Sequence, residues 1–359
     1  MKCLERILQY APVLFYSRIS PFSGTGLNGS LVDVRVKEKR RKDNMQNMLK
    51  KFREKLPICS CIAVIVSYLL IFHLSAIPVM MVLHQDFAVQ LASMLIADVF
   101  VLAVFFAMGF GDVLAQKSRG ILYSIGTGGY MIMVGAVAAV SNLAMYGLTE
   151  DYKFQALAPA GDILLFILAM LGIGFTEELV FRGIVTSILK DKFSVHTDKG
   201  IFLVIVLQGA LFGACHMTNI LSGIGLESAL VQSIMASFLG MLLGAVYLRT
   251  NSLWFVMLLH AWNDFGALLA AGLYGDNTIT GSIDGYTWRN LAGIPAYLVV
   301  VLILLRSSKR REIKDGRLYP APFGIRIAKG IVLTLFCAGF LVLAAVSFFL
   351  TAHQDLLNI

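Results

Sequence analysis

Three charged residues stand close together in an otherwise apolar stretch, GFTEELVFRG, which contains Glu177, Glu178 and Arg182. An ionisable side chain at the centre of a membrane helix costs roughly 2.5 to 3.5 kcal/mol on insertion scales, so such residues are usually paired or functional. Glu178 and Arg182 are four positions apart with the acid first, the favoured order for an ion pair within a helix. Glu177 lies about 100° away around the helix. We expect Arg182 to neutralise Glu178 and Glu177 to face a cavity, with a purely structural ion cluster as the alternative.

Another apolar stretch, LFGACHMTN, carries a histidine beside small residues. Phe212 and His216 are four positions apart and share a face, so the phenyl ring can pack against the imidazole. Gly209 and Gly213 lie on that face as a G-x-x-x-G pair, which permits a close approach of two helices. The spacing therefore predicts that His216 faces a neighbouring helix.

A third apolar stretch, LLHAWNDFG, places Asn263 and Asp264 three and four residues after His260. These positions share one helix face. A single histidine in a membrane helix is usually a packing residue. Two histidines and three acids on three apolar helices instead indicate a shared site.

Such a site suits hydrolysis of an amide bond. A carboxylate can deprotonate water, a histidine can orient that water or protonate the leaving amine, and a donor can stabilise the oxyanion. Alternatively, His216, His260 and Asp264 could hold a zinc ion that lowers the pKa of a bound water. The sequence alone does not choose between these two mechanisms, so no cofactor is certain and zinc stays possible as a cofactor.

The elements that carry these residues are predicted to be membrane helices. Of the 359 residues, 58% are hydrophobic and 14% are charged, which is typical of a chain largely in lipid. A window of roughly 20 apolar residues spans a bilayer. About nine such windows occur, at Pro57–Leu83, Phe87–Ala115, Gly120–Tyr146, Gly161–Leu189, Gly200–Leu221, Ser228–Leu248, Ser252–Leu273, Asn290–Leu305 and Ile327–Thr351. The fold class is therefore all-α, a polytopic transmembrane helix bundle.

Charges in the loops predict the orientation. Basic residues occupy every second loop, beginning with the segment before the first window and then at Lys117, Lys190, Arg249 and Arg306, whereas the intervening loops are mostly acidic. Because basic loops stay in the cytoplasm, we expect nine spans with a cytoplasmic N-terminus and an external C-terminus. The predicted divisions are 1–56, a basic cytoplasmic segment; 57–147, N-terminal helices; 160–273, a catalytic helix core; and 290–359, C-terminal helices.

The net charge of +8 is explained by these loops and not by nucleic-acid binding. The basic run from Arg35 to Lys42 is predicted to tether the chain to anionic lipid, and no signal peptide is recognised. A further hypothesis places the start of translation at Met45 or Met48. The five cysteines form no metal-binding spacing.

The order E-E-x-x-x-R, F-x-x-x-H and H-x-x-x-(N/D), each on its own apolar helix, resembles the CPBP family of intramembrane proteases over Asp162 to Leu273. This family includes the CAAX-processing enzymes and bacterial members linked to bacteriocin maturation and self-immunity. The resemblance implies that Glu177 activates water with help from His216, and that His260 and the residue four positions later line the oxyanion side. It also implies a membrane-associated, prenylated or leader-bearing protein or peptide as substrate, and a multi-pass protein of the bacterial cytoplasmic membrane.

The chain departs from the family at one position, because many relatives have Asn where this sequence has Asp264. An ionised Asp cannot donate a hydrogen bond to an oxyanion, so Asp264 must be protonated, orient His260 or bind a metal. Asn263 is the alternative donor.

Three other functions are the alternatives to this one. Gly109 to Asp112 spell the G-x-G-D of presenilin-like proteases, but no second aspartate stands on a preceding helix, so chance is the better explanation. A transporter could use Asp98, Glu177, His216 and Asp264 as an ion path, yet no internal repeat is recognised. A non-catalytic immunity or scaffold protein is the third alternative.

Overall fold

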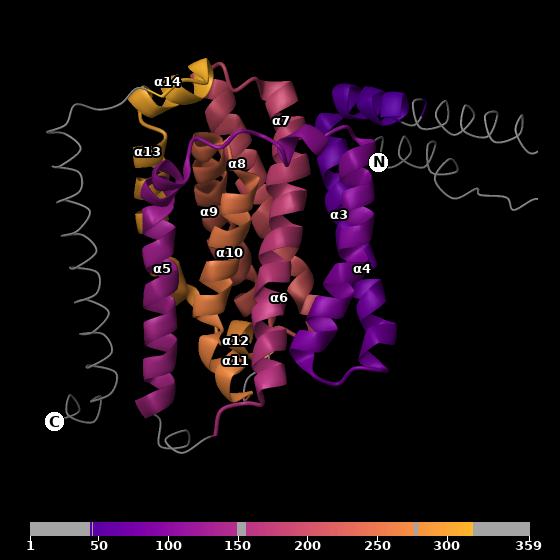
Figure 1. Ribbon diagram of the computed structural model, residues 1–359, viewed down its shortest axis with the longest axis vertical. Coiled ribbons are helices and arrows are strands. Elements are labelled where there is room, and N and C mark those ends of the chain that lie inside the picture. Colours follow the sequence, from indigo (N-terminus) through magenta and orange to yellow (C-terminus); the bar gives the residue numbers. More distant parts are fainter. Residues whose placement is uncertain (1–43, 45, 149–155, 276–278, 319–359) are drawn as a thin grey trace, which may run out of the picture.

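The computed structural model describes residues 44, 46–148, 156–275 and 279–318, and within these ranges every regular element is a helix (Figure 1). The predicted ninth span, Ile327–Thr351, and the basic run from Arg35 to Lys42 lie outside the described residues, as does Met45.

Long helices run side by side along the vertical direction of Figure 1, joined by short connections. Their bounds are α3 Pro57–Met80, α4 Asp86–Ala107, η2 Gly111–Val113, α5 Ile121–Leu148, α6 Ala160–Glu178, η4 Leu179–Val185, α7 Thr186–Phe193, α8 Asp198–Cys215, η5 His216–Ser222, α9 Leu226–Thr250, α10 Leu253–Ala267, α11 Leu269–Tyr274, α12 Ile279–Asp284, η6 Trp288–Gly293, α13 Ile294–Leu304 and α14 Ser307–Asp315.

Six of the described helices are long and apolar enough to cross a membrane, or seven if the bent pair formed by η6–α13 and α14 is one span. Large apolar side chains such as Leu70, Val99 and Leu122 are exposed on the bundle surface, as expected for helices in lipid. The chain is thus an integral multi-pass membrane protein. The described residues thus contain fewer candidate spans than the nine predicted for the whole chain.

The predicted span Ser252–Leu273 differs most from expectation, because it is broken. The α-helix ends at Ala267, and Leu268, with φ −111° and ψ 11°, separates α10 from α11. A backbone group freed within a membrane needs a new partner. Asn142 supplies one, since its Oδ1 accepts a 2.6 Å hydrogen bond from the amide of Ala270. Hydropathy alone cannot reveal such a break.

The predicted span Gly161–Leu189 forms a 34-residue helical run, Ala160–Phe193, that contains a π-helical segment. This segment, η4, begins directly after Glu178 and ends at Val185. π-helical turns are rare and occur frequently at functional sites. Here the segment carries Arg182 in the fully buried interior.

Glycines allow α8 and α9 to approach closely. A Cβ atom at Gly209 would lie 2.7 Å from the carbonyl oxygen of Ser237, and one at Gly213 would lie 2.3 Å from that of Ser233. The close approach expected from the G-x-x-x-G spacing is therefore present, and it places the end of α8 and His216 against α9.

A buried polar cluster fixes α14 on the bundle at the end where α7 stops and α8 begins (Figure 1). Tyr123 donates a 2.9 Å hydrogen bond to Glu312 Oε2, and Arg249 lies 3.7 Å from the same carboxylate. Lys309 also pairs with Glu312. The side chain of Glu312 is only 2% exposed. The basic helix α14 is thus attached to α5 and α9 through one acid.

Replacing Glu312 with alanine is expected to lower the free energy of unfolding by about 3 kcal/mol, because Arg249 keeps a buried charge without its partner. Arg311→Ala is the matched control, since Arg311 lies on the same helix but is exposed, and it should change stability by less than about 0.5 kcal/mol. Unfolding in detergent micelles measures both. Equal stabilities of the two variants would show that the cluster does not hold α14.

Candidate active site

A cavity of about 820 Å³ brings together residues from the three motifs. Its lining comes from α3 to α6, from α8 to α10, and from the segment after α11. Five of the predicted site residues and Phe212 contribute to it: Glu177, His216, His260, Asn263 and Asp264. Glu178 and Arg182 lie behind this lining, fully buried. The two glutamates therefore occupy different environments.

Glu178 and Arg182 form a short ion pair. Arg182 Nη1 lies 2.6 Å from Glu178 Oε1, and both side chains are 0% exposed. The other guanidinium nitrogen, Nη2, donates a 2.9 Å hydrogen bond to the carbonyl of Gly240 on α9. The guanidinium carbon also lies 4.9 Å from the centre of the Phe212 ring. Arg182 thereby joins the π-helical segment to α8 and α9.

The same carboxylate also holds His260, a contact that the sequence does not predict. His260 Nδ1 lies 2.8 Å from Glu178 Oε1. Because a carboxylate only accepts hydrogen bonds, Nδ1 carries the hydrogen and the ring orientation is fixed. Glu178 therefore connects Arg182 on its own helix with His260 on α10.

The second nitrogen of His260 faces the cavity between two carboxylates. Its Nε2 lies 3.7 Å from Glu177 Oε2 and 3.4 Å from Asp264 Oδ2. The side chains of Glu177 and Asp264 are 19% and 26% exposed, whereas that of His260 is 4% exposed. Three acids thus surround one imidazole, and two of them reach the cavity.

His216 is the first residue of η5, where the α-helix α8 tightens to a 3-10 helix. Its Nδ1 makes a 2.9 Å hydrogen bond with the carbonyl of Phe212. A carbonyl only accepts, so Nδ1 must carry the hydrogen, and in the neutral ring Nε2 is left as an acceptor. His216 can therefore accept a hydrogen bond from a water in the cavity.

Phe212 stands between the two histidines. Its ring centre lies 5.0 Å from that of His216 and 5.7 Å from that of His260, edge to face in both cases. Phe181 packs edge-on against the same ring at 4.9 Å. Aromatic pairs at these separations favour edge-to-face packing, so Phe212 restrains both imidazoles.

The side-chain amide of Asn263 already donates one hydrogen bond. Its Nδ2 donates a 2.7 Å hydrogen bond to the carbonyl of Leu259 on its own helix, and the residue is 8% exposed. Asp264 is the more open of the two neighbours and directs Oδ2 to His260.

The zinc alternative does not fit the arrangement of the side chains. Among the described residues, no three His, Cys, Asp or Glu side chains are placed to hold one metal ion. His216, His260 and Asp264 were the proposed ligands. Nδ1 of each histidine is engaged, with a backbone carbonyl and with Glu178 respectively, which is compatible with metal binding through Nε2, so the misfit lies in the placement of the three side chains relative to one another. We therefore derive no step through a metal.

Close contact between α6 and α10 sets the distance between Glu178 and His260. A Cβ atom at Gly174 would lie 2.4 Å from the carbonyl of Met257 and 2.8 Å from the amide nitrogen of Ala261. Both of these atoms belong to the backbone of α10, so only glycine fits this position without moving a helix.

Gly174→Ala is expected to lower stability by about 1 to 3 kcal/mol and to reduce turnover, because His260 moves away from Glu178. Gly172→Ala is the matched control on the same helix, since its Cβ would meet Leu91 Cδ1 at 3.5 Å and Met94 Sδ at 3.8 Å, both ordinary contacts. Unfolding and cleavage assays of both variants check this. A Gly174→Ala variant as active as Gly172→Ala would contradict it.

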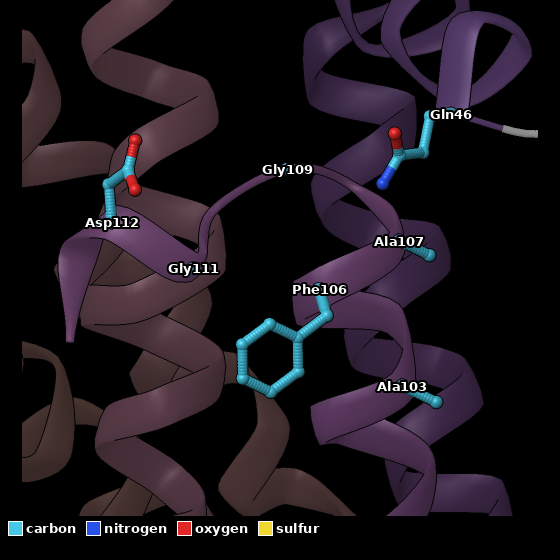
Figure 2. A pocket seen from close by; sticks show the side chains of 7 residues that line it. All are labelled: Gln46, Ala103, Phe106, Ala107, Gly109, Gly111 and Asp112. Carbon is cyan, nitrogen blue, oxygen red and sulfur yellow. The ribbon is translucent and has the colours of Figure 1, made fainter. Parts of the chain in front are cut away.

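A second pocket, of about 500 Å³, lies beside the G-x-G-D sequence (Figure 2). Asp112 in η2 is exposed, and no other acid lines this pocket. Asp98, the nearest preceding aspartate on α4, is 8% exposed and belongs to the lining of neither pocket. The pair of aspartates that the aspartyl protease chemistry requires is therefore not formed by these residues.

Comparison with protein families supports the grouping of the three motifs. Residues 159–266 match the family model described as type II CAAX prenyl endopeptidase Rce1-like. This range includes every residue of the three motifs, from Glu177 to Asp264. No curated protein and no solved structure matches the chain.

Proposed function

Because residues 159–266 form an Rce1-like domain of the CAAX prenyl endopeptidase family, we propose that the protein is an intramembrane endopeptidase in which Glu177 activates water. Its substrate is a membrane-associated protein or peptide. The observation that carries this proposal is the unequal exposure of the two glutamates. Glu177 reaches the cavity with 19% of its side chain exposed, whereas Glu178 is fully buried.

In the proposed reaction, the Glu177 carboxylate removes a proton from a water held in the cavity. The water oxygen forms a bond with the scissile carbonyl carbon, and the carbonyl oxygen becomes an oxyanion. His216 is placed to orient the water, because its Nδ1 is engaged by the Phe212 carbonyl and only Nε2 is left for a partner in the cavity. Collapse of the tetrahedral intermediate breaks the carbon–nitrogen bond, and the protonated Glu177 returns its proton to the leaving amine.

His260 is placed to stabilise the oxyanion. Glu178 fixes its Nδ1, so its imidazolium form can donate from Nε2 into the cavity. Asp264, 3.4 Å from the same nitrogen, favours that charged form and orients the ring, so it need not donate to the oxyanion itself. This role accounts for an acid at a position where many relatives carry Asn.

We propose a protein or peptide with a prenylated C-terminus as the substrate, because the matching family model is named for CAAX prenyl endopeptidases. The basic connections and α14 then face the cytoplasm, with the N-terminus on the same side, and a bacterial cytoplasmic membrane is the proposed location.

The test uses the purified protein in nanodiscs with a peptide ending in a farnesylated C-a-a-X sequence, and the same peptide without the farnesyl group. Mass spectrometry should detect release of the three C-terminal residues from the farnesylated peptide. In cells, the Glu177→Gln variant should trap uncut membrane-associated proteins. Absence of cleavage in vitro together with absence of trapped proteins would contradict the proposal.

A further inference from the structure

We infer that the side-chain amides of Asn219 and Gln232 form a subsite that binds the substrate backbone about two residues from the scissile bond. The inference rests on the proposed function, because it assigns a partner to a peptide in the same cavity. Neither residue belongs to the three motifs.

The two amides meet inside the cavity that holds Glu177 and His216. Asn219 Nδ2 donates a 2.7 Å hydrogen bond to Gln232 Oε1. This bond uses Asn219 Nδ2 and Gln232 Oε1, so Asn219 Oδ1 is left to accept and Gln232 Nε2 to donate a further hydrogen bond. Both residues are only partly buried, and both line the cavity.

The position of Asn219 relative to His216 follows from the helix type. Both residues lie in η5, three positions apart. In a 3-10 helix, side chains three positions apart eclipse each other and the rise is about 2.0 Å per residue, so Asn219 stands about 6 Å from His216 on one face. An extended peptide advances about 3.3 Å per residue, so this separation corresponds to about two residues.

The free atoms of the pair match one residue of an extended peptide. Such a residue offers one N–H donor and one C=O acceptor, and leaving either unsatisfied in an apolar environment is unfavourable. Met235, Ala236 and Leu239, on the same helix as Gln232, give the cavity an apolar wall beside the pair. Asn219 Oδ1 can accept the peptide N–H, and Gln232 Nε2 can donate to the peptide carbonyl.

A purely structural role for the pair is less well supported, because η5 is fixed by other contacts. Thr218 donates a 2.7 Å hydrogen bond to the carbonyl of Cys215, and its hydroxyl oxygen lies 3.4 Å from His73 Nε2 on α3. Ser233 on α9 also donates to the carbonyl of Gly213 at 2.7 Å, just before η5. These three contacts hold the segment without the amide pair.

Gln232→Met keeps the length of the side chain and removes its amide. For the farnesylated peptide, this variant should raise KM about 3- to 10-fold with kcat changed less than twofold, as expected for loss of one hydrogen bond to substrate. Gln90→Met is the matched control, since Gln90 lines the same cavity from α4 but directs its amide to Met94 Sδ. It should leave KM unchanged.

A peptide with an ester in place of the amide two residues from the scissile bond tests the contact directly. The ester lacks the N–H that Asn219 Oδ1 would accept, so it should bind the Glu177→Gln variant about 3- to 10-fold more weakly than the amide peptide. With Asn219→Leu added, the two peptides should bind equally, a non-additivity expected of a direct contact.

The outcomes separate this inference from the proposed function. If the protein with its natural Glu177 cleaves no farnesylated peptide, both fail. If it cleaves, but Gln232→Met leaves KM unchanged or lowers only kcat, the subsite is overturned while the protease function stands. Two results together support the subsite. Gln232→Met should raise KM while Gln90→Met does not, and the variant with Asn219→Leu should bind the ester and amide peptides equally.

Discussion

Replacing Glu177 with glutamine is expected to lower kcat for peptide hydrolysis by about 10²- to 10⁴-fold, the usual contribution of a general base. The amide keeps the size of the side chain but cannot take a proton from water. Stability should change little, because Glu177 is partly exposed and its one close charged partner, His260 Nε2, is 3.7 Å away. His260 keeps its contact with Glu178, so no buried charge is left alone.

Three measurements on the Glu177→Gln variant check this expectation. Cleavage of the farnesylated peptide should be lost, binding of that peptide should persist, and unfolding in detergent should match the unchanged protein. Glu227→Gln serves as the control, since it removes a carboxylate from an exposed position in the first turn of α9. A variant that unfolds would instead assign Glu177 a structural role, and full activity would exclude it as the base.

The second large effect concerns the buried ion pair. Glu178→Leu and Arg182→Met should each destabilise the protein by about 3 to 5 kcal/mol, because each leaves a charge buried without its partner. The double variant, Glu178→Leu with Arg182→Met, should recover much of that stability, since an apolar pair of similar volume replaces the ions. Cleavage should not recover, because His260 Nδ1 has lost its acceptor.

Unfolding and turnover of the two single variants and the double variant form a thermodynamic cycle. A double variant as unstable as the sum of the singles would show that the two residues are not coupled. A stable double variant with normal turnover would show that Glu178 does not position His260.

Local spacing accounts for the parts of the site that the sequence predicts. The Glu178–Arg182 pair and the Phe212–His216 contact each join residues four positions apart, and a helix places such residues side by side. The spacing of two glycines likewise predicts that α8 has a closely packed neighbour, although it does not predict that this neighbour is α9. Contacts of this kind need no knowledge of the tertiary fold.

The remaining contacts join residues from different helices, and no spacing predicts them. Glu178 and His260 are 82 positions apart and meet only because Gly174 lets α6 approach α10. The amide pair of Asn219 and Gln232 likewise depends on how η5 meets α9. For this reason the sequence suggests that Glu178 serves Arg182 alone, whereas the structure gives it a second partner.

Hydropathy predicts which segments are apolar but not where a helix breaks. It identifies the stretches that form α3 to α9. It also predicts one continuous span over Ser252–Leu273, where the structure has the two helices α10 and α11. The break at Leu268 depends on Asn142 accepting the amide of Ala270 from another helix, and the π-helical turn after Glu178 depends on the packing of its buried side chains. Mean hydropathy over a window of roughly 20 residues detects neither the break nor the π-helical turn.

We propose that, of two adjacent glutamates, Glu177 carries out the chemistry and Glu178 positions His260. The most direct test is the rate of peptide cleavage by the folded fraction of Glu177→Gln and of Glu178→Gln, measured side by side. We expect folded Glu177→Gln to cleave about 10²- to 10⁴-fold more slowly than the unchanged protein. Folded Glu178→Gln should lose less activity than this, because its glutamine oxygen can still accept from His260 Nδ1. Normal cleavage by Glu177→Gln together with none by a fully folded Glu178→Gln would reverse the two roles and contradict the claim.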